Sequence, residues 1–382
     1  MDKKNILFLM GMFPSYGGVE KVSVTLANKF IEDGHRVTIA SYIQPNNDFA
    51  QLYLSKKCKL LSLTLPVLSL KNIKQLRKYI LVNNIDVVIN QWVVPFYATL
   101  VWKMAIRGTN CKVYSVHHNK PDTNKRIETL DLLINKGKKY LKIVRFFVRE
   151  VSRLSLAFCV NCSHKYILLS PSFIPLAKKY ARIFNSDKFL SIANPIVMPV
   201  FEGVIHKEKE ILYVGRIEYN QKRTYRLIDI WKELEPCYPD WKLMIVGDGE
   251  DRDNLHERIE KYGLKRVFIT GFVNPQEYYR RSSILIMTSE YEGFPLVIIE
   301  AMALGCVPIV YNSFESASDM IEHGYNGVLV ERPFANNTFI KAIQELMDNA
   351  DYRDRLSQNS RIVSKKYSDD NIINEWYQIM NK

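Results

Sequence analysis

Two glutamates, Glu292 and Glu300, stand where an apolar run ends and a helix is expected to begin near Pro295, with seven residues between them. Proline is favoured at a first helical position. A carboxylate ahead of a helix start can bind sugar hydroxyls while the amides of the first turn face a phosphate. Glu300, inside an apolar helix, needs a hydroxyl or a cation as its partner, and a ribose would supply one. The neighbouring residues expected to contact such a ligand are Gly293, Phe294, Pro295 and Leu296.

A basic pair follows another apolar run, over residues 211–214. Gly215 and Arg216 come directly after this run, and Lys222 lies six residues beyond the arginine. A guanidinium and an ammonium group that converge at a strand end suit a diphosphate, and each charge-assisted hydrogen bond is worth roughly 1.5–3 kcal/mol. The alternative is a pair of solvated charges at a helix start, and the spacing alone favours neither.

Glycines mark two further turns between an expected strand and helix. Gly17 and Gly18 precede the helix expected over residues 19–31, and Gly247, Asp248 and Gly249 follow the strand expected over 242–246. Glycine lets the backbone approach a ligand closely, and amides at a helix start favour a phosphate. A plain turn is the alternative at each place.

Metal binding is not expected. Residues 251–253 read Asp-Arg-Asp, which superficially resembles a metal-binding pair of aspartates. These residues open an expected helix, however, and aspartate is favoured at a helix start by the helix dipole. The six cysteines include one pair at two-residue spacing, Cys159 and Cys162, with His164 nearby. A structural zinc site needs four ligands. We therefore predict half-buried, reduced thiols, and neither a metal nor a cofactor.

Short apolar runs alternate with helical patterns along the chain, which predicts α/β domains with parallel sheets. The first set of strands is expected at 6–10, 36–40, 86–90, 112–116, 166–170 and 188–193, with a helix over 171–183. The second is expected at 211–214, 242–246, 267–270, 284–287, 307–310 and 327–330.

Residues 195–209 lack a clear period and predict a linker. We therefore expect Rossmann-like domains over 1–194 and 195–367, with a final helix over 368–382 that packs back on the first. Ligands bind beyond the carboxyl ends of parallel strands, so we expect these ends to face each other across a cleft.

The charge of the chain is unevenly distributed. The 382 residues carry a net charge of +13, and residues 120–188 alone hold 15 Lys and Arg against five Asp and Glu, a net +10. Residues 138–154 predict a basic amphipathic helix, either docked on an anionic membrane or simply solvated on one face.

No signal peptide or membrane-spanning stretch is evident, since the longest nearly apolar run, residues 92–102, contains Pro95. We expect a cytoplasmic protein, with possible contact at the inner face of the membrane.

Together these motifs resemble the retaining glycosyltransferases of family 4, the glycosyl transferases group 1, which have the two-domain GT-B fold. The resemblance covers nearly the whole chain and is most specific over residues 213–330. It implies that Glu292 contacts the donor sugar, Glu300 the ribose, and Arg216 with Lys222 the leaving diphosphate. It also places Gly17 and Gly18 near the phosphate and sugar. The turn implied to recognise the nucleotide base through backbone groups is Gly271-Phe272.

The family's N-domain histidine corresponds to His117 or His118, and the following Asn119 and Pro121 favour His118. Two departures stand out. Arg223 stands at a position where the family often has glycine. Residues 313–316 contain no glycine, although the family often has glycines there.

The resemblance implies a metal-independent hexosyltransferase that transfers a sugar with retention from a UDP- or GDP-sugar. Its acceptor would be a glycan or a lipid-linked molecule in bacterial surface polysaccharide synthesis. The alternatives are a sugar-nucleotide epimerase of the same fold and a non-catalytic nucleotide-sugar-binding protein. A nucleic-acid partner is not expected, because no recognised nucleic-acid-binding motif accompanies the basic block.

Overall fold

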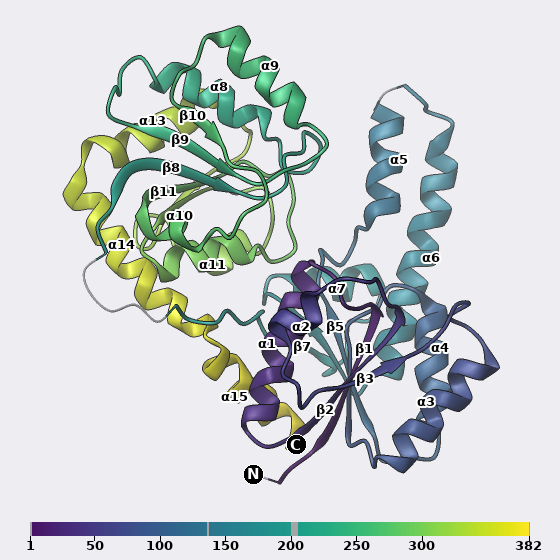
Figure 1. Ribbon diagram of the computed structural model, residues 1–382. Helices are drawn as coiled ribbons and strands as arrows, with labels where there is room; N and C mark the ends of the chain where they lie inside the picture. Colours follow the sequence, from purple (N-terminus) through teal and green to yellow (C-terminus); the bar gives the residue numbers. More distant parts are fainter. Residues whose placement is uncertain (1, 136, 200–204, 382) are drawn as a thin grey trace. The chain divides into compact units, whose positions relative to one another are not determined.

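The computed structural model describes residues 2–135, 137–199 and 205–381 (Figure 1). The chain divides into two compact units. The N-terminal domain comprises residues 1–195 together with 369–382, and the C-terminal domain comprises residues 196–368. Each contains one parallel sheet, which confirms the prediction of two Rossmann-like α/β domains.

The N-terminal domain has a seven-stranded parallel sheet in the order β3-β2-β1-β4-β5-β6-β7. Its strands are β1 (Asn5–Met12), β2 (Arg36–Ile43), β3 (Lys59–Ser62), β4 (Val87–Asn90), β5 (Lys112–His117), β6 (Lys165–Leu168) and β7 (Phe189–Ser191). Its helices are α1 (Gly18–Glu32), α2 (Phe49–Tyr53), α3 (Leu70–Val82), α4 (Phe96–Ala105), α5 (Lys125–Asn135), α6 (Leu141–Cys162), α7 (Phe173–Ala181) and α15 (Asp369–Met380). Sequence analysis missed β3, whose residues at this edge of the sheet are mostly exposed and lack the apolar run of a buried strand.

The C-terminal domain has a six-stranded parallel sheet in the order β10-β9-β8-β11-β12-β13. Its strands are β8 (Glu208–Val214), β9 (Lys242–Val246), β10 (Val267–Ile269), β11 (Ser282–Met287), β12 (Val307–Tyr311) and β13 (Val328–Val330). Its helices are α8 (Tyr225–Leu234), α9 (Arg252–Tyr262), α10 (Gln276–Arg281), α11 (Leu296–Ala303), α12 (Ala317–Met320), α13 (Asn336–Asp348) and α14 (Ala350–Ser364). The expected linker is partly outside the described residues, at 200–204, and β8 begins at Glu208.

Apolar strands supply the centre of each domain. In the C-terminal domain, Ile211, Ile245 and Ile284 of three adjacent strands are at most 1% exposed and pack with α8 and α13. A comparable core in the N-terminal domain lies between its sheet and helices α3, α4, α6 and α7. Because the cores fix the strands, they also fix the loops at the carboxyl ends of those strands.

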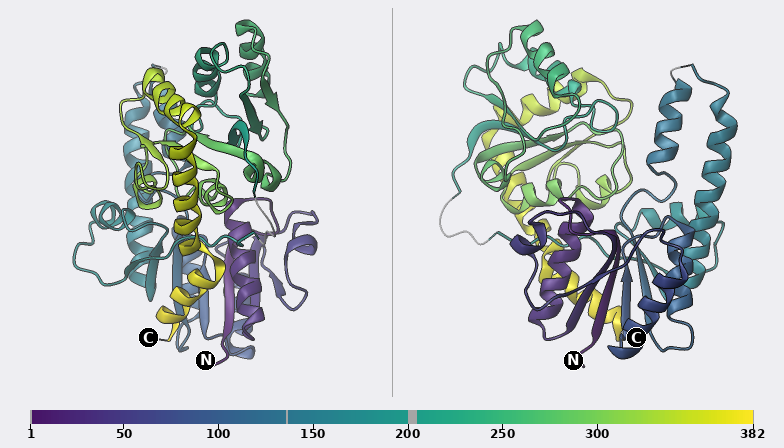
Figure 2. Two further views of the ribbon diagram at one scale, coloured as in Figure 1. Left: turned by 90° about the vertical axis from the view of Figure 1, so that its left-hand side faces the viewer. Right: turned by 45° about the vertical axis from the view of Figure 1, so that its right-hand side comes forward.

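The last helix, α15, belongs to the N-terminal domain although it follows α14 in sequence (Figure 2). Trp376 is 2% exposed and meets the ring of Tyr114 with centroids 6.2 Å apart. The Tyr377 hydroxyl donates a hydrogen bond to Asp33 at 2.7 Å, and Lys29 pairs with Asp370 at 2.6 Å. The chain therefore crosses to the C-terminal domain near residue 195 and returns near residue 369.

The basic helix differs from its expected range of 138–154. Helix α6 begins at Leu141 and continues to Cys162, because its second half packs into the core through Leu156, Cys159 and Val160. Cys159 and Cys162 therefore lie on a helix, the first fully buried and the second partly buried, and both are free thiols. Among the described residues, no helix combines the length and the apolar character needed to cross a bilayer.

Candidate active site

The loop after β8 carries the predicted basic pair. The Tyr213 hydroxyl donates a hydrogen bond to the Arg216 carbonyl at 2.8 Å, which ties this loop to its own strand. The Arg216 side chain is 69% exposed, so its guanidinium can meet a ligand directly from solvent. The Lys222 side chain is only 16% exposed. The two cations lie in one loop at the carboxyl end of β8, as the sequence predicted, but in different environments.

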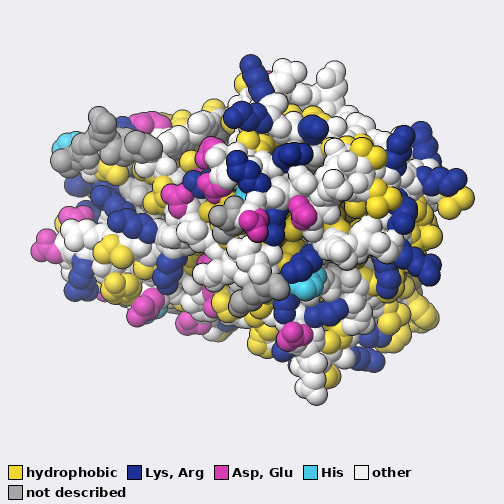
Figure 3. Space-filling model, turned by 90° about the horizontal axis from the view of Figure 1, so that it is seen from below, with side chains coloured by type: hydrophobic (Ala, Val, Ile, Leu, Met, Phe, Trp, Pro, Cys, Tyr) yellow, Lys and Arg dark blue, Asp and Glu magenta, His cyan; other side chains and the backbone are white. Residues whose placement is uncertain are grey.

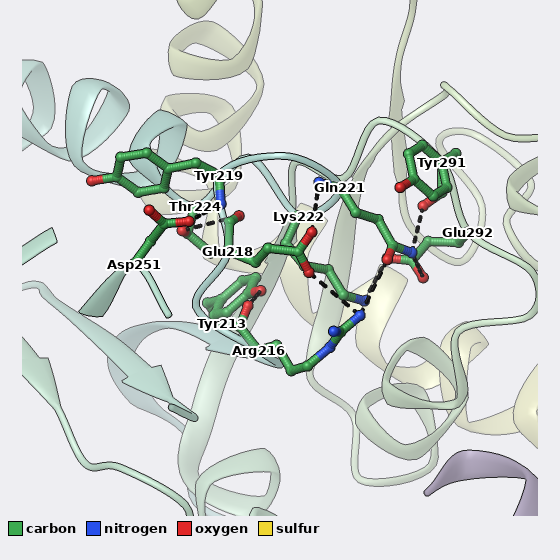
Figure 4. Close-up of polar contacts among 10 residues, drawn as sticks. All are labelled: Tyr213, Arg216, Glu218, Tyr219, Gln221, Lys222, Thr224, Asp251, Tyr291 and Glu292. Atoms are coloured by element: carbon green, nitrogen blue, oxygen red, sulfur yellow. Dashed lines mark hydrogen bonds and ion pairs between the residues drawn. The ribbon is translucent and has the colours of Figure 1, made fainter. Parts of the chain in front are cut away.

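Lys222 and Glu292 form an ion pair, with Lys222 Nζ 2.6 Å from Glu292 Oε1 (Figure 4). The Glu292 side chain is 8% exposed, and a carboxylate this buried needs a cationic partner. Sequence reasoning assigned the two residues to different parts of the ligand, the diphosphate and the sugar. Their direct contact was not predicted, because it joins loops that are 70 residues apart.

Gln221 connects the predicted charged residues, and sequence analysis missed it. Its Nε2 donates to the Tyr291 carbonyl at 3.1 Å and to Glu292 Oε2 at 3.4 Å, while its Oε1 accepts from Arg216 Nη2 at 3.3 Å (Figure 4). Its own carbonyl accepts from the Glu290 amide at 2.8 Å. Its position between Arg216 and Lys222 was the only signal in the sequence.

The glycines after β9 serve a contact within the protein. A Cβ atom on Gly247 would stand 1.9 Å from the carbonyl oxygen of Gly215, and one on Gly249 would stand 2.2 Å from that of Ile217. The Ile217 amide donates to the Asp248 carbonyl at 2.9 Å. We expected this loop to pass close to a ligand. The loop packs on the loop after β8 and supports it, and its contact with a ligand stays a prediction.

The aspartates near the start of α9 are engaged in local contacts. Asp248 pairs with Arg252 at 3.1 Å. Asp251 precedes α9 and accepts hydrogen bonds from the Tyr219 amide at 2.7 Å and from Asn254 at 2.9 Å. Among the described residues, no group of three or more His, Cys, Asp and Glu side chains could hold a metal ion. The structure therefore gives Asp248 and Asp251 structural contacts.

Helix α11 begins directly after Pro295, close to the expected start. Pro295 supplies no side-chain hydrogen bond to cap the helix, and it has no amide hydrogen of its own. The first-turn amides that a phosphate could use are therefore those of Leu296 and Val297. Phe294 was expected to face the ligand, but its side chain is 8% exposed and packs against Tyr367 with ring centroids 5.7 Å apart. An aromatic side chain gains more from this apolar contact than from exposure in a polar site.

Glu300 has a protein hydroxyl as a partner. The Tyr279 hydroxyl donates to its Oε2 at 3.0 Å, and the glutamate is half-buried on α11. The expectation that this carboxylate needs a hydroxyl is met within the protein. A ribose hydroxyl would therefore share the carboxylate with Tyr279.

The turn after β10 combines a constrained backbone with an exposed ring. Gly271 has a φ of +76°, a value that favours glycine, and pairs with the backbone of Gly247. Phe272 is 80% exposed. A large apolar ring exposed beside a strand end offers a stacking surface.

The two departures from the family pattern have a local structural explanation. Arg223 has a φ of +52°, a left-handed conformation that glycine adopts without strain and arginine rarely adopts. Its guanidinium lies 3.5 Å from Glu290. In the region without glycines, Ser313 and Ser316 donate hydrogen bonds to the carbonyls of Ser289 and Gly293, at 2.5 and 2.7 Å. These serines fasten the loop that carries Glu292.

In the N-terminal domain, the predicted glycines stand between β1 and α1. Gly17 precedes the first residue of α1, Gly18, and has no side chain to cap the helix. Neither has a positive φ, and a Cβ atom on Gly18 would have no neighbour within 4 Å. The fold therefore does not require glycine at position 18. A ligand that approaches the backbone closely would explain why this residue has no side chain.

The two candidate histidines occupy different environments at the end of β5. His117 is 3% exposed, its Nδ1 lies 2.7 Å from the Tyr166 hydroxyl, and burial lowers its pKa to about 4. It lines a small, partly open cavity that has room for about one water molecule. His118, just beyond the strand, is half-buried, and its Nε2 lies 2.5 Å from Gln91 Oε1. Burial, and to a lesser extent the neighbouring His117, lower the pKa of His118 to about 3, so both imidazoles are neutral near pH 7.

Comparison with known proteins gives two family models, one for each half of the chain. Residues 16–179 match "Glycosyltransferase Family 4", and residues 199–363 match "Glycosyl transferases group 1". The chain belongs to glycosyltransferase family 4. The first range contains the predicted glycines and histidines of the N-terminal domain, and the second contains the charged residues of the C-terminal domain. The protein is therefore a glycosyltransferase with the GT-B fold.

Several bacterial glycosyltransferases are similar to this one. An uncharacterised glycosyltransferase of Haemophilus influenzae is 28% identical over 99% of this chain and 100% of its own length. The amylovoran biosynthesis glycosyltransferase AmsD of Erwinia amylovora is 29% identical over 62% of this chain and 68% of its own.

Among solved structures, the lipopolysaccharide outer core galactosyltransferase WaaB is 19% identical, with a TM-score of 0.72 over 98% of both chains. Anabaena HepE in complex with UDP-glucose is 17% identical, with a TM-score of 0.75 over 98% of this chain and 99% of its own. These structures share the fold of this glycosyltransferase.

Proposed function

We propose that this glycosyltransferase is a retaining hexosyltransferase that moves a sugar from a nucleotide sugar, a UDP- or GDP-sugar, to a glycan or lipid-linked acceptor in bacterial surface polysaccharide synthesis. The C-terminal domain would bind the donor and the N-terminal domain the acceptor. The observation that carries the proposal is the Lys222–Glu292 ion pair, beside Arg216 and the start of α11. Cations, a carboxylate and first-turn amides within one set of loops suit a sugar diphosphate.

The proposed chemistry is electrostatic stabilisation of the leaving nucleotide diphosphate. Arg216 and Lys222 would hold the negative charge that develops as the bond to the sugar breaks, assisted by the amides of Leu296 and Val297. Glu292 would orient Lys222 and accept hydrogen bonds from sugar hydroxyls, and Glu300 would bind the ribose. His118, neutral because of its low pKa, would act as a hydrogen-bonding group toward the sugar. In this proposal, the two cations and the helix amides would take the role that a metal ion plays in other transferases.

The relatives support the substrate class. HepE has been solved with UDP-glucose, and the name of AmsD assigns it to amylovoran biosynthesis. A Campylobacter jejuni relative, 24% identical over 47% of this chain and 50% of its own, is named as an N-acetylgalactosaminyltransferase acting on a glycan linked to undecaprenol diphosphate. A lipid-linked acceptor is consistent with the strongly basic N-terminal domain.

The first test is a thermal-shift series with UDP, GDP, ADP and their common sugars, without added metal. One nucleotide family should stabilise the wild type, because a ligand bound only to the native state raises the melting temperature. Lys222→Ala should lose the shift. Lys209→Ala, which removes an exposed lysine paired with Asp240, should keep it. A nucleotide shift that survives in Lys222→Ala would contradict the diphosphate site.

The second test measures transfer with the nucleotide sugar that binds. Lys222→Ala and Glu292→Ala should each reduce kcat by at least about 100-fold, the usual effect of losing a group that stabilises developing charge, while both remain folded. NMR of the product should show the anomeric configuration of the donor. Wild-type turnover in either variant, or an inverted product, would refute the proposal. Conversion of the donor without an acceptor would instead indicate an epimerase.

A further inference from the structure

Helices α5 and α6 form a hairpin that extends away from the N-terminal sheet (Figures 1 and 2). The second half of α6 is anchored in the domain core, where Ser155, Leu156, Cys159 and Val160 are buried. In its first half, from Leu141 to Leu154, no residue is buried. The tip of the hairpin, which we define as residues 137–147, therefore contributes little to the core of the domain.

Large apolar side chains nevertheless cover this first half of α6. Tyr140, Ile143, Phe147, Val151 and Leu154 recur at helical spacing and are between 56% and 71% exposed. Phe146 flanks them at 60% exposure. Scattered apolar residues are normal on a protein surface, but a continuous stripe marks an interaction site.

The charges around this stripe are almost all positive. Residues 132–149 contain six Lys and Arg and no Asp or Glu. Lys138, Lys139 and Lys142 are exposed at the tip. The nearest acidic side chains, on α5 and on α6 itself, are engaged in ion pairs, Asp131 with Arg145 and Glu150 with Arg153. The tip therefore presents uncompensated positive charge beside exposed apolar surface.

The same character extends over the adjacent helices. Figure 3 shows basic and hydrophobic side chains interspersed, with few acidic ones, over the part of the N-terminal domain where α3 and α4 lie. On α3, Leu70, Leu81 and Val82 are at least 50% exposed, and Lys71, Lys74 and Lys78 are exposed as well. Helix α4, which contacts both α3 and α6, lies between this surface and the hairpin.

We propose that the tip of the α5–α6 hairpin docks on an anionic lipid surface. Its apolar side chains would enter the boundary between headgroups and acyl chains, with Tyr140 at the interface, and its lysines would contact the anionic headgroups. A second copy of the chain is a poorer partner, because it would bring two basic tips together. This inference does not depend on the donor or on the chemistry of transfer.

The experiment measures co-sedimentation of the full-length protein with vesicles. Vesicles of phosphatidylethanolamine and phosphatidylglycerol should bind it, neutral phosphatidylcholine vesicles should bind it much more weakly, and salt should reduce the binding. Lys138→Glu/Lys139→Glu should weaken binding more than about tenfold, since each lysine near the surface contributes measurably and each reversal adds repulsion. Ile143→Ser/Phe147→Ser should weaken it comparably by removing the apolar contact.

Matched controls separate this surface from charge and hydrophobicity in general. Lys56→Glu/Lys57→Glu reverses two exposed lysines elsewhere in the N-terminal domain, and Ile362→Ser removes an apolar side chain that is 58% exposed on α14. Both should bind vesicles like the wild type. So should Lys222→Ala, which distinguishes docking from transfer.

Three results would overturn the inference. The first is no binding of the wild type to anionic vesicles at low salt, and the second is equal binding to neutral ones. The third is wild-type binding by both hairpin variants. In that last case, light scattering that shows an oligomer dissociated by Ile143→Ser/Phe147→Ser would identify a second copy as the occupant of the stripe.

Discussion

Gln221 contacts two of the three charged side chains on which the proposed chemistry depends. Its amide contacts Arg216 on one side and Glu292 on the other, while its backbone binds the loop after β11. It is a positioning residue, because it acts through the orientation of these side chains. Such a role affects transfer more than it affects folding.

We predict that Gln221→Leu lowers kcat/KM for transfer about fivefold, which corresponds to about 1 kcal/mol, the typical net value of a hydrogen bond. Gln75→Leu, which removes a glutamine of the N-terminal domain that donates a hydrogen bond to the Ser62 carbonyl, is the control. Steady-state kinetics and melting temperatures of both variants provide the test. Equal activity in the two variants would argue against a positioning role.

His117 makes stability depend on pH. Its pKa is lowered by burial to about 4, whereas the pKa of a histidine in an unfolded chain is about 6.5. The unfolded state therefore takes up a proton first as the pH falls. The stability that this histidine contributes is present above pH 6.5 and is lost as the pH falls toward 4.

Between pH 7 and pH 5, the wild type should lose about 2 kcal/mol more free energy of unfolding than His117→Gln. Urea unfolding at both pH values measures this difference. His256→Gln, at an exposed histidine, should keep the wild-type pH dependence. The explanation would be wrong if His117→Gln lost as much stability as the wild type.

At the scale of the element, the glycines of different turns are present for different physical reasons. The loops after β8 and β9 touch through their backbones at Gly215 and Gly247, so glycine is required there by the fold. The start of α1 has no such contact at Gly18. Substitution by alanine can therefore distinguish a structural glycine from one reserved for a ligand.

Gly18→Ala should change the free energy of unfolding by less than about 0.5 kcal/mol, since alanine suits a helix and meets no neighbour. Its activity should nevertheless fall, because the added methyl group would obstruct a bound phosphate. Gly247→Ala should instead destabilise the C-terminal domain by about 1–3 kcal/mol through overpacking. Thermal unfolding and transfer assays separate the two effects. Full activity of Gly18→Ala would contradict the prediction that Gly18 lies against a bound phosphate.

At the scale of the whole molecule, the final helix makes the N-terminal domain depend on the end of the chain. Trp376→Ala should cost about 3–5 kcal/mol, as expected for a buried tryptophan. Gln378→Ala, at an exposed position on the same helix, should be near neutral. Urea unfolding of both variants gives the comparison. A small effect of Trp376→Ala would show that α15 is not needed for the stability of its domain.

The division into strands and helices could be predicted because parallel strands buried on both faces are continuous apolar runs. Residues 242–246 illustrate this, since the expected range and β9 coincide. The edge strand β3 was missed because it has few buried side chains. The length of α6 was misjudged because its second half is fixed by the core and not by its own amphipathic pattern.

The sequence by itself determined the family, the fold class and the placement of Arg216, Lys222 and Glu292 at strand ends, because each is encoded in local residue types and spacing. Only the tertiary structure decided the partners of these side chains. Glu292 meets Lys222, Glu300 meets Tyr279, and Phe294 turns into the core. Such contacts join separate elements of the chain, and their geometry depends on how the strands and helices pack side by side, which no local pattern specifies.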